Sequence, residues 1–167
     1  MSRPALVLVG IPGSGTSTLA RLVAAERGLP AVDVDELVEQ ALGAPVAEYF
    51  ATAGEAAYRE VEERVSLDAL RRTGVVALGS GAVDSAAVRA ALAGLPVVWL
   101  RTSVPTATRR LGMNSLGMGA LVAIRNRMGE MLASRAPFYA EVAQTVVDTD
   151  RLTAEQVAAA IGEQGER

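Results

Sequence analysis

The sequence predicts an α/β fold in three α/β/α layers around a five-stranded parallel sheet. Two observations support this prediction. Short, continuous apolar runs alternate along the chain with segments whose apolar residues recur at helical spacing, and such runs are typical of strands buried on both faces. With 167 residues, the chain is most economically a single domain, residues 1–167.

The predicted elements follow one another as strand and helix. The strands span residues 5–9, 29–34, 75–78, 96–100 and 144–147. The helices span residues 16–27, 36–42, 45–72 (one or two helices, with a break at Ala53-Gly54), 84–92, 105–111, 121–135 and 153–161. Gly28 is expected to cap the first helix, and Thr153 with Gln156 forms a capping box at the start of the last. Ala136-Pro137 is expected to end the helix over 121–135, and the Gly- and Met-rich segment 112–119 to be a loop.

Composition narrows the chemistry that is open to the chain. It has no Cys and no His, so any acid–base or metal chemistry must use carboxylates, hydroxyls and phosphates. The net charge of −3 argues against nucleic acid as the main partner. No apolar run is long enough to cross a membrane and no signal peptide is recognisable, so we expect a cytoplasmic protein. All sixteen basic residues are Arg.

A glycine-rich turn, Gly10-Ile11-Pro12-Gly13-Ser14-Gly15-Thr16-Ser17, joins the first strand to the first helix. Its spacing matches a phosphate-binding P-loop and predicts a fold of P-loop NTPase type. The position before Ser17 should be Lys and is Thr16, which offers a hydroxyl and no positive charge. A general bias from Lys to Arg would not place Thr there. Backbone N–H groups can still cradle a phosphate, and the expected phosphate-binding residues are Gly13, Ser14, Gly15, Thr16, Ser17 and Thr18.

Further blocks are more specific than the P-loop. With it, they make the chain resemble the shikimate kinases, small P-loop phosphotransferases, along nearly its full length. The blocks that carry the resemblance are Asp33-Val34-Asp35, Phe50-Ala51-Thr52-x-Gly54-Glu55, Tyr58-Arg59-x-x-Glu62, Leu78-Gly79-Ser80-Gly81-Ala82-Val83 and Ser134-Arg135-Ala136-Pro137-x-Tyr139.

The resemblance implies three sets of site residues. The acceptor, a small polyol carboxylate such as shikimate, would contact Asp35, Phe50, Tyr58, Arg59, Glu62, Gly79, Ser80, Gly81 and Arg135. Arg110 and Arg151 would contact the nucleotide, and Ser17 with Asp33 would hold Mg²⁺ bound with ATP. Asp35 would position the attacking hydroxyl or accept its proton, and Thr16 stands at the catalytic P-loop position. ATP or ADP and the acceptor are the expected partners of a monomer.

Three departures from the family pattern affect the expected activity. Ser80 replaces the middle one of three glycines. The lid, at about residues 112–120, lacks the Arg that reaches the transferring phosphoryl group, because Gly117 stands there. The segment Asp148-Thr149-Asp150-Arg151 stands where the family builds the other wall of the adenine pocket, and it mostly lacks the family's usual Arg-x-Pro pattern.

Three functions stay open at this point. The first is a shikimate-binding protein with impaired or absent kinase activity, a pseudoenzyme. The second is a working shikimate kinase of aromatic amino-acid biosynthesis in which another cation, such as Arg125 or Arg127, substitutes for the missing ones. The third is a kinase for another small hydroxy acid.

Overall fold

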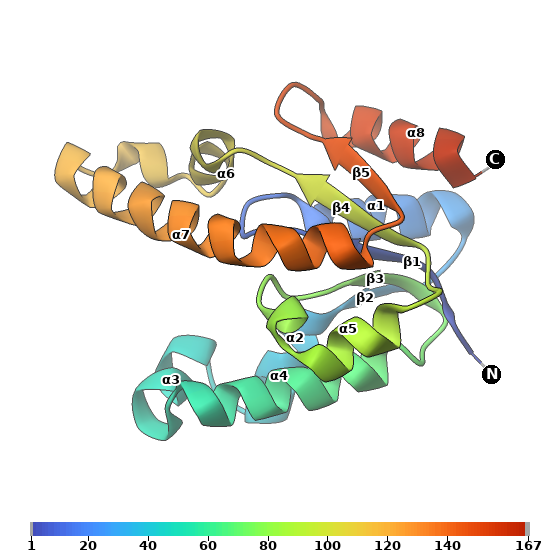
Figure 1. Cartoon of the computed structure of the whole chain (residues 1–167), viewed down its shortest axis with the longest axis horizontal. Coiled ribbons are helices and arrows are strands. Elements are labelled where there is room, and N and C mark those ends of the chain that lie inside the picture. The colour runs from blue at the N-terminus through green and yellow to red at the C-terminus, as the bar shows by residue number, and fades with distance from the viewer. Residues whose placement is uncertain (1, 166–167) are drawn as a thin grey trace.

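The computed structural model describes residues 2–165 and shows three layers with a parallel sheet in the middle (Figure 1). The strands lie in the order β2-β3-β1-β4-β5, and all four neighbouring pairs are parallel. Their bounds are β1 Pro4–Val9, β2 Ala31–Asp33, β3 Gly74–Ala77, β4 Val97–Arg101 and β5 Thr145–Asp148. The P-loop therefore leaves the central strand, at the edge where the carboxyl ends of the strands meet and where α/β sheets bind ligands.

The strands are apolar because both faces of the sheet are covered. Alternate residues of β1 divide between two core clusters: Val7 and Val9 belong to one, Leu6 and Leu8 to the other. The partners of Val7 in the neighbouring strands, Val76 and Val97, lie on the same face as Val7. The period of two along each strand thus fills both layers at once.

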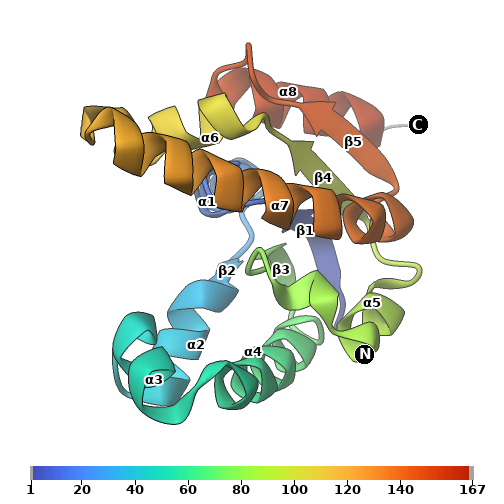
Figure 2. The same ribbon diagram turned by 60° about the vertical axis from the view of Figure 1, so that its left-hand side comes forward.

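Eight α-helices and two short 3₁₀ helices complete the described part of the chain. The bounds are α1 Thr16–Arg27, α2 Val34–Leu42, α3 Val46–Ala53, α4 Glu55–Ala69, η1 Ala82–Asp84, α5 Ala86–Leu92, α6 Val104–Arg110, η2 Met113–Ser115, α7 Met118–Val142 and α8 Ala154–Gly165. Helices α1 and α8 pack together on one face of the sheet, and α4, α5 and α7 cover the other (Figure 1). Helices α2, α3 and α4 form a group of their own beside β2 (Figure 2).

Several local predictions are confirmed. The break at Ala53-Gly54 separates α3 from α4, and Gly28 caps α1 in the left-handed conformation, with φ 63°. The capping box of α8 forms in both directions. The Gln156 backbone N–H donates to Thr153 Oγ1 at 3.2 Å, and the Thr153 N–H donates to Gln156 Oε1 at 2.9 Å.

The predicted end of a helix at Ala136-Pro137 is wrong, because α7 continues through Pro137 to Val142. A proline inside a helix removes one backbone hydrogen bond and costs about 3 kcal/mol. The extra turns place Tyr139 in the core, where its ring lies 5.6 Å from that of Trp99 and its hydroxyl donates to the Ser80 carbonyl at 2.6 Å. Burial of a large aromatic side chain offsets the lost bond.

Two other boundaries differ from the prediction. The segment 112–119 is not all loop, since it contains η2 and the first residues of α7. The helix predicted from Asp84 begins as η1 and becomes α-helical only after Ser85, whose Oγ accepts the Val88 N–H at 3.2 Å. Turn and cap residues decide such boundaries locally, and sequence patterns place them within a few residues. None of the helices in the described part of the chain has the length and apolar character needed to cross a bilayer.

The start of β3 depends on Gly74, and Gly74→Ala is expected to destabilise the fold by about 2 kcal/mol or more. The backbone at Gly74 has φ 139°, which L side chains rarely adopt, and an added Cβ would overlap the Pro30 carbonyl. Urea denaturation measures the loss. Gly94→Ala is the control, because Gly94 also has a positive φ, 75°, but open space around a Cβ. Equal losses in the two variants would contradict the role of Pro30.

Candidate active site

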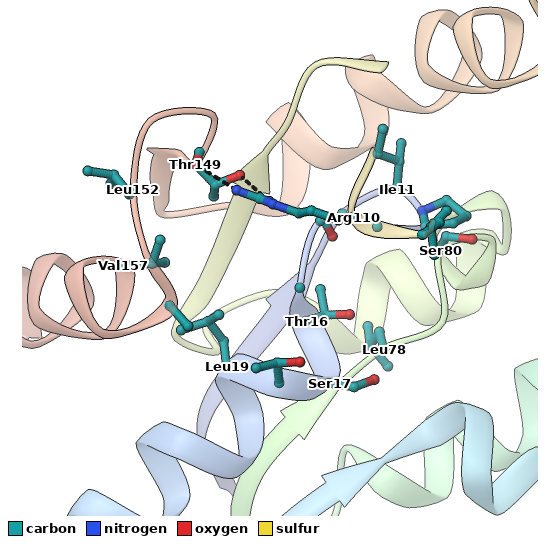
Figure 3. Close-up of a pocket in the computed structure, with 18 of the residues that line it drawn as sticks. Ile11, Thr16, Ser17, Leu19, Leu78, Ser80, Arg110, Thr149, Leu152 and Val157 are labelled. Carbon is teal, nitrogen blue, oxygen red and sulfur yellow. Dashed lines mark hydrogen bonds between the residues drawn. The ribbon is translucent and has the colours of Figure 1, made fainter. Parts of the chain in front are cut away.

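A pocket of about 650 Å³ lies at the carboxyl ends of the strands. The β1–α1 loop, the end of α6 and the turn from β5 to α8 surround it (Figure 3). The predicted phosphate-binding residues, Gly13 to Thr18, all line it, together with Asp35, Ser80 and Arg110. The structure thus brings together most of the residues that the sequence assigned to phosphate and nucleotide.

The β1–α1 loop has the backbone geometry of an anion-binding turn. Gly13 has φ 83° and Gly15 φ 93°, and Gly15 is the N-cap of α1. A Cβ at Gly13 would lie 2.5 Å from the Ala107 carbonyl oxygen, so the loop packs against α6 only because this residue is glycine. Thr16 and Ser17 begin α1 and line the pocket (Figure 3). The helix N-terminus supplies backbone N–H groups and a partial positive charge.

Positive side chains are scarce in this pocket. Arg110 is the one cation among the described residues that line it. Its guanidinium is already bonded, with Nη1 donating to Thr149 Oγ1 at 3.0 Å and Nη2 to the Thr149 carbonyl at 2.7 Å (Figure 3). Arg125, a proposed substitute cation, donates from Nε to Thr108 Oγ1 on α6 at 3.4 Å and does not line the pocket. Arg127 does not line it either.

Arg151, which was assigned to the nucleotide, and Gly117, at the lid position where the resemblance leads us to expect an Arg, do not line the pocket. Gly117 is the N-cap of α7, and open space surrounds the position of its Cβ. Arg151 lines a second hollow, of about 470 Å³, beside Arg101 and Asp148. The structure therefore does not bring Arg151 to the P-loop pocket. The sequence placed Thr149 in a segment assigned to the nucleotide pocket but did not pair it with Arg110, because no local pattern links two residues 39 positions apart.

The two predicted aspartates at the end of β2 have different surroundings. Asp33 is the N-cap of α2, and its Oδ1 accepts the Asp35 backbone N–H at 3.1 Å. Arg21 of α1 pairs with Asp33 at 3.6 Å and also with Glu36. Among the described residues, Asp35 lines the P-loop pocket and Asp33 does not. Among residues 2–165, no three or more Asp or Glu side chains come close enough together to hold a metal ion by themselves.

The Asp35 carboxyl titrates far above its usual range. The residue as a whole is exposed, but desolvation of its carboxyl group at the pocket, and then the charges of Asp33, Glu62 and Glu39, raise its pKa to about 6. Each of these effects disfavours the ionised carboxylate. At neutral pH the group is mostly ionised but close to its pKa, which suits a residue that accepts a proton from a hydroxyl.

Asp35→Asn is expected to stabilise the protein increasingly as the pH rises from about 4 to about 7. The unfolded chain releases the Asp35 proton near its ordinary pKa, whereas the folded chain keeps it until about pH 6, so folding loses stability across that window. The open pocket screens part of the penalty, and we expect a gain of about 1 kcal/mol at pH 7. Urea denaturation of both proteins at several pH values measures it, and a pH-independent difference would contradict it.

The turn after β3, Gly79-Ser80-Gly81, lies against the ends of the side chains that were assigned to the acceptor. A Cβ at Gly79 would lie 2.9 Å from Asp35 Oδ1. One at Gly81 would lie 2.9 Å from Arg135 Nη2 and closer still to Arg59. Ser80 has no positive φ and fits between them without backbone strain. The turn thus lies against both arginines that were assigned to the acceptor.

Glu62 holds two of the residues assigned to the acceptor, Tyr58 and Arg59, by hydrogen bonds. Its carboxylate is buried and accepts hydrogen bonds from Arg59 Nη1 at 2.7 Å and from the Tyr58 hydroxyl at 3.2 Å. Glu55 approaches Arg59 from the exposed side, at 3.6 Å. Phe50 stacks on Tyr58 with ring centroids 4.8 Å apart. The four predicted residues Phe50, Tyr58, Arg59 and Glu62 therefore form one cluster.

Arg135 supplies the other side and is held by a residue that sequence reasoning did not assign to the site. Its Nη2 donates to Asp84 Oδ2 at 3.2 Å, and its Nη1 donates to Ser80 Oγ at 3.4 Å. The sequence placed Asp84 only at the start of the helix predicted over residues 84–92. Its carboxylate meets Arg135 because η1 and α7 pack against each other, which no sequence pattern reveals.

Comparison with known proteins gives one consistent result. The shikimate kinase family model matches residues 12–165. The shikimate kinase of Mycobacterium tuberculosis is 45% identical over 152 residues, covering 89% of this chain and 85% of the relative. That of Salinispora arenicola is 43% identical and covers 93% of both chains. Among solved structures, the shikimate kinase from Acinetobacter baumannii in complex with shikimate superposes with a TM-score of 0.85 and 27% identity, over 99% of this chain and 94% of that one.

Proposed function

The chain belongs to the shikimate kinase family, and on that premise we propose that it binds shikimate or a similar polyol carboxylate, with impaired or absent phosphoryl transfer from ATP to the 3-hydroxyl. One observation carries the proposal. The acceptor side keeps its carboxylate and both guanidinium groups around the Gly79–Gly81 turn, while the P-loop pocket has Arg110 as its single cation among the described residues that line it. The two halves of the site thus differ in the charged groups that they offer.

The acceptor side has the chemistry that a polyol carboxylate requires. Two guanidinium groups, of Arg59 and Arg135, converge over Gly81 and suit a carboxylate. Asp35, with its raised pKa, suits a hydroxyl group. The solved relative with shikimate bound, from Acinetobacter baumannii, supports the choice of ligand. This set of residues is proposed as the acceptor site.

The phosphate side lacks the charges that speed phosphoryl transfer. Transfer depends on positioning and on stabilising the charge of the moving group. Loss of one preorganised donor typically lowers the rate by about 10²–10³, and an Arg on the transferring group contributes about 10³–10⁵. Thr16 and Gly117 provide neither charge, and Arg110 already donates to Thr149. The two effects act on the same charge, so they need not be additive.

We propose nucleotide and metal binding although the pocket has little positive charge, because the P-loop offers backbone N–H groups and Ser17 and Asp33 offer oxygen ligands. The backbone N–H groups from Gly13 to Ser17 can hold a phosphate at the start of α1. Mg²⁺ would enter with ATP and would be held by the Ser17 hydroxyl and by Asp33, directly or through water, since hydroxyl and carboxylate oxygens suit this ion. When bound, Mg²⁺ neutralises phosphate charge. To bind Mg²⁺, Asp33 would have to give up its ion pair with Arg21.

A working shikimate kinase with a substitute cation is the second candidate, and the complete acceptor side favours it. Such an enzyme would have to bring Arg125 away from Thr108 or Arg110 away from Thr149. Arg110 already lines the pocket, whereas Arg125 does not and would have to move into it.

The experiment is an ADP-release assay with ATP, Mg²⁺ and shikimate, together with calorimetry of shikimate binding alone. We expect binding without turnover at the rates of ordinary kinases, about 1–100 s⁻¹. Turnover in that range would overturn the impaired-enzyme proposal and support the second candidate. The absence of both heat and thermal shift at millimolar shikimate would overturn the acceptor site.

A further inference from the structure

The guanidinium of Arg135 is already occupied by a carboxylate of the chain itself. Its Nε donates to Asp84 Oδ1 at 3.4 Å and to Oδ2 at 3.3 Å, and its Nη2 donates to Oδ2 at 3.2 Å. Ser80 Oγ accepts from Nη1 at 3.4 Å. The Asp84 carboxylate thus lies against the same cation that the proposed function assigns to the carboxylate of the acceptor.

The two partners of this ion pair differ in burial. The Arg135 side chain is 8% exposed, whereas the Asp84 side chain is 41% exposed. Their contacts, at 3.2–3.4 Å, are longer than the 2.7–2.9 Å or so that is usual for charge-assisted hydrogen bonds. A fixed, buried cation is therefore covered by an anion that is loosely held and can turn into solvent.

Arg59, the other guanidinium on this side of the site, is compensated differently. Glu62 holds it at 2.7 Å, is itself buried and also accepts from Tyr58, so this partner is fixed. The exposed Glu55 lies farther away, at 3.6 Å. The guanidinium nitrogens nearest Gly81 are Arg59 Nη1, which pairs with Glu62, and Arg135 Nη2, which pairs with Asp84. Of these two pairs, the second has the longer contact and the more exposed carboxylate, so an incoming anion opens it at the lower cost.

We propose that Asp84 is a selectivity residue, an internal carboxylate that competes with the carboxylate of the ligand for Arg135 and so lowers the affinity of the site for acidic ligands relative to neutral polyols. The inference rests on the proposed function of this site. It goes beyond that function, because it says that the chain itself limits binding of its carboxylate ligand. An acidic ligand must displace Asp84, whereas a neutral polyol can bind beside the closed ion pair.

A role in orienting Arg135 would have the opposite consequence. If Asp84 only fixed the guanidinium for the ligand, its neutralisation would weaken the binding of anions. Competition predicts tighter binding instead, so the sign of the change in affinity separates the two roles.

The experiment compares the wild type with Asp84→Asn and with Glu63→Gln, using calorimetry and thermal shift. Glu63 is a matched control, because its carboxylate accepts from the Oγ of Ser85, the residue after Asp84, at 2.7 Å but makes no hydrogen bond or ion pair with Arg135 among the described residues. The probes are shikimate, its uncharged methyl ester and sulfate. We expect Asp84→Asn to bind shikimate about fivefold more tightly, as for release of a partly exposed ion pair. The ester should bind both proteins equally, and Glu63→Gln should behave as the wild type. Asp84→Ser repeats the test with a smaller side chain.

The outcomes separate this inference from the proposed function. If shikimate binds neither protein but sulfate stabilises Asp84→Asn more than the wild type, the inference holds and the assignment of shikimate fails. If Asp84→Asn and Asp84→Ser bind neither anion more tightly than the wild type, Asp84 does not compete and the inference is overturned. An equal gain in Glu63→Gln would also overturn it, because the effect would then come from net charge alone.

Discussion

The double variant Thr16→Lys/Gly117→Arg is expected to raise the rate of ATP-dependent phosphoryl transfer to shikimate by about 10³-fold or more. It adds a cation at the P-loop and one at the segment that precedes α7, the two positions where the family resemblance leads us to expect Lys and Arg. The P-loop already has its backbone geometry, and a Cβ at Gly117 meets open space. ADP release in the presence and absence of shikimate measures the gain.

The matched control is Thr16→Met/Gly117→Gln, which adds similar length at both positions without charge. It should leave the rate unchanged. The single variant Thr16→Lys should recover part of the gain, because a single charge stabilises part of the transferring group. If the double variant were no faster than the control, the proposal that missing charges at these two positions limit phosphoryl transfer would be overturned.

Arg135→Met is expected to weaken shikimate binding by about 10²-fold. The guanidinium is buried beside the Gly79–Gly81 turn, and a buried cation that binds a carboxylate contributes more than an exposed one. Methionine keeps the length and much of the volume of the side chain, so the helix should still pack. Calorimetry with shikimate measures the loss.

Arg72→Met is the control for the loss of one positive charge. Arg72 pairs with Asp68 at 2.6 Å on the surface and does not take part in the acceptor site. Such exposed ion pairs contribute little to stability. Its shikimate affinity should equal that of the wild type. A loss as large as that of Arg135→Met would contradict direct binding by Arg135.

The sequence predicted much of the fold because its signals are local. The apolar run 5–9 and the glycine turn after it place β1 and the P-loop, and the break at Ala53-Gly54 separates α3 from α4. The end predicted at Pro137 was wrong because a local rule was outweighed by burial of Tyr139, which depends on Trp99 and Ser80. Local signals fail where distant residues determine the free energy.

The candidate site divides in the same way. The residue types at the P-loop, at Asp35 and at the two acceptor arginines can be read from motifs, since spacing along one turn or helix fixes them. The partners of those residues cannot. Asp84 lies 51 positions from Arg135 and Thr149 39 positions from Arg110, and only the packing of helices and strands brings each pair together.

By itself, the sequence determined the three-layer fold, the family resemblance and the absence of Lys at the P-loop, because each is written in residue identity and short-range spacing. Only the tertiary structure decided which charges are available. In the structure Arg110 donates hydrogen bonds to Thr149, Arg151 lies outside the P-loop pocket, and Asp84 forms an ion pair with Arg135. The physical reason is that an electrostatic interaction depends on distance and burial, which arise when segments far apart in the chain pack against one another.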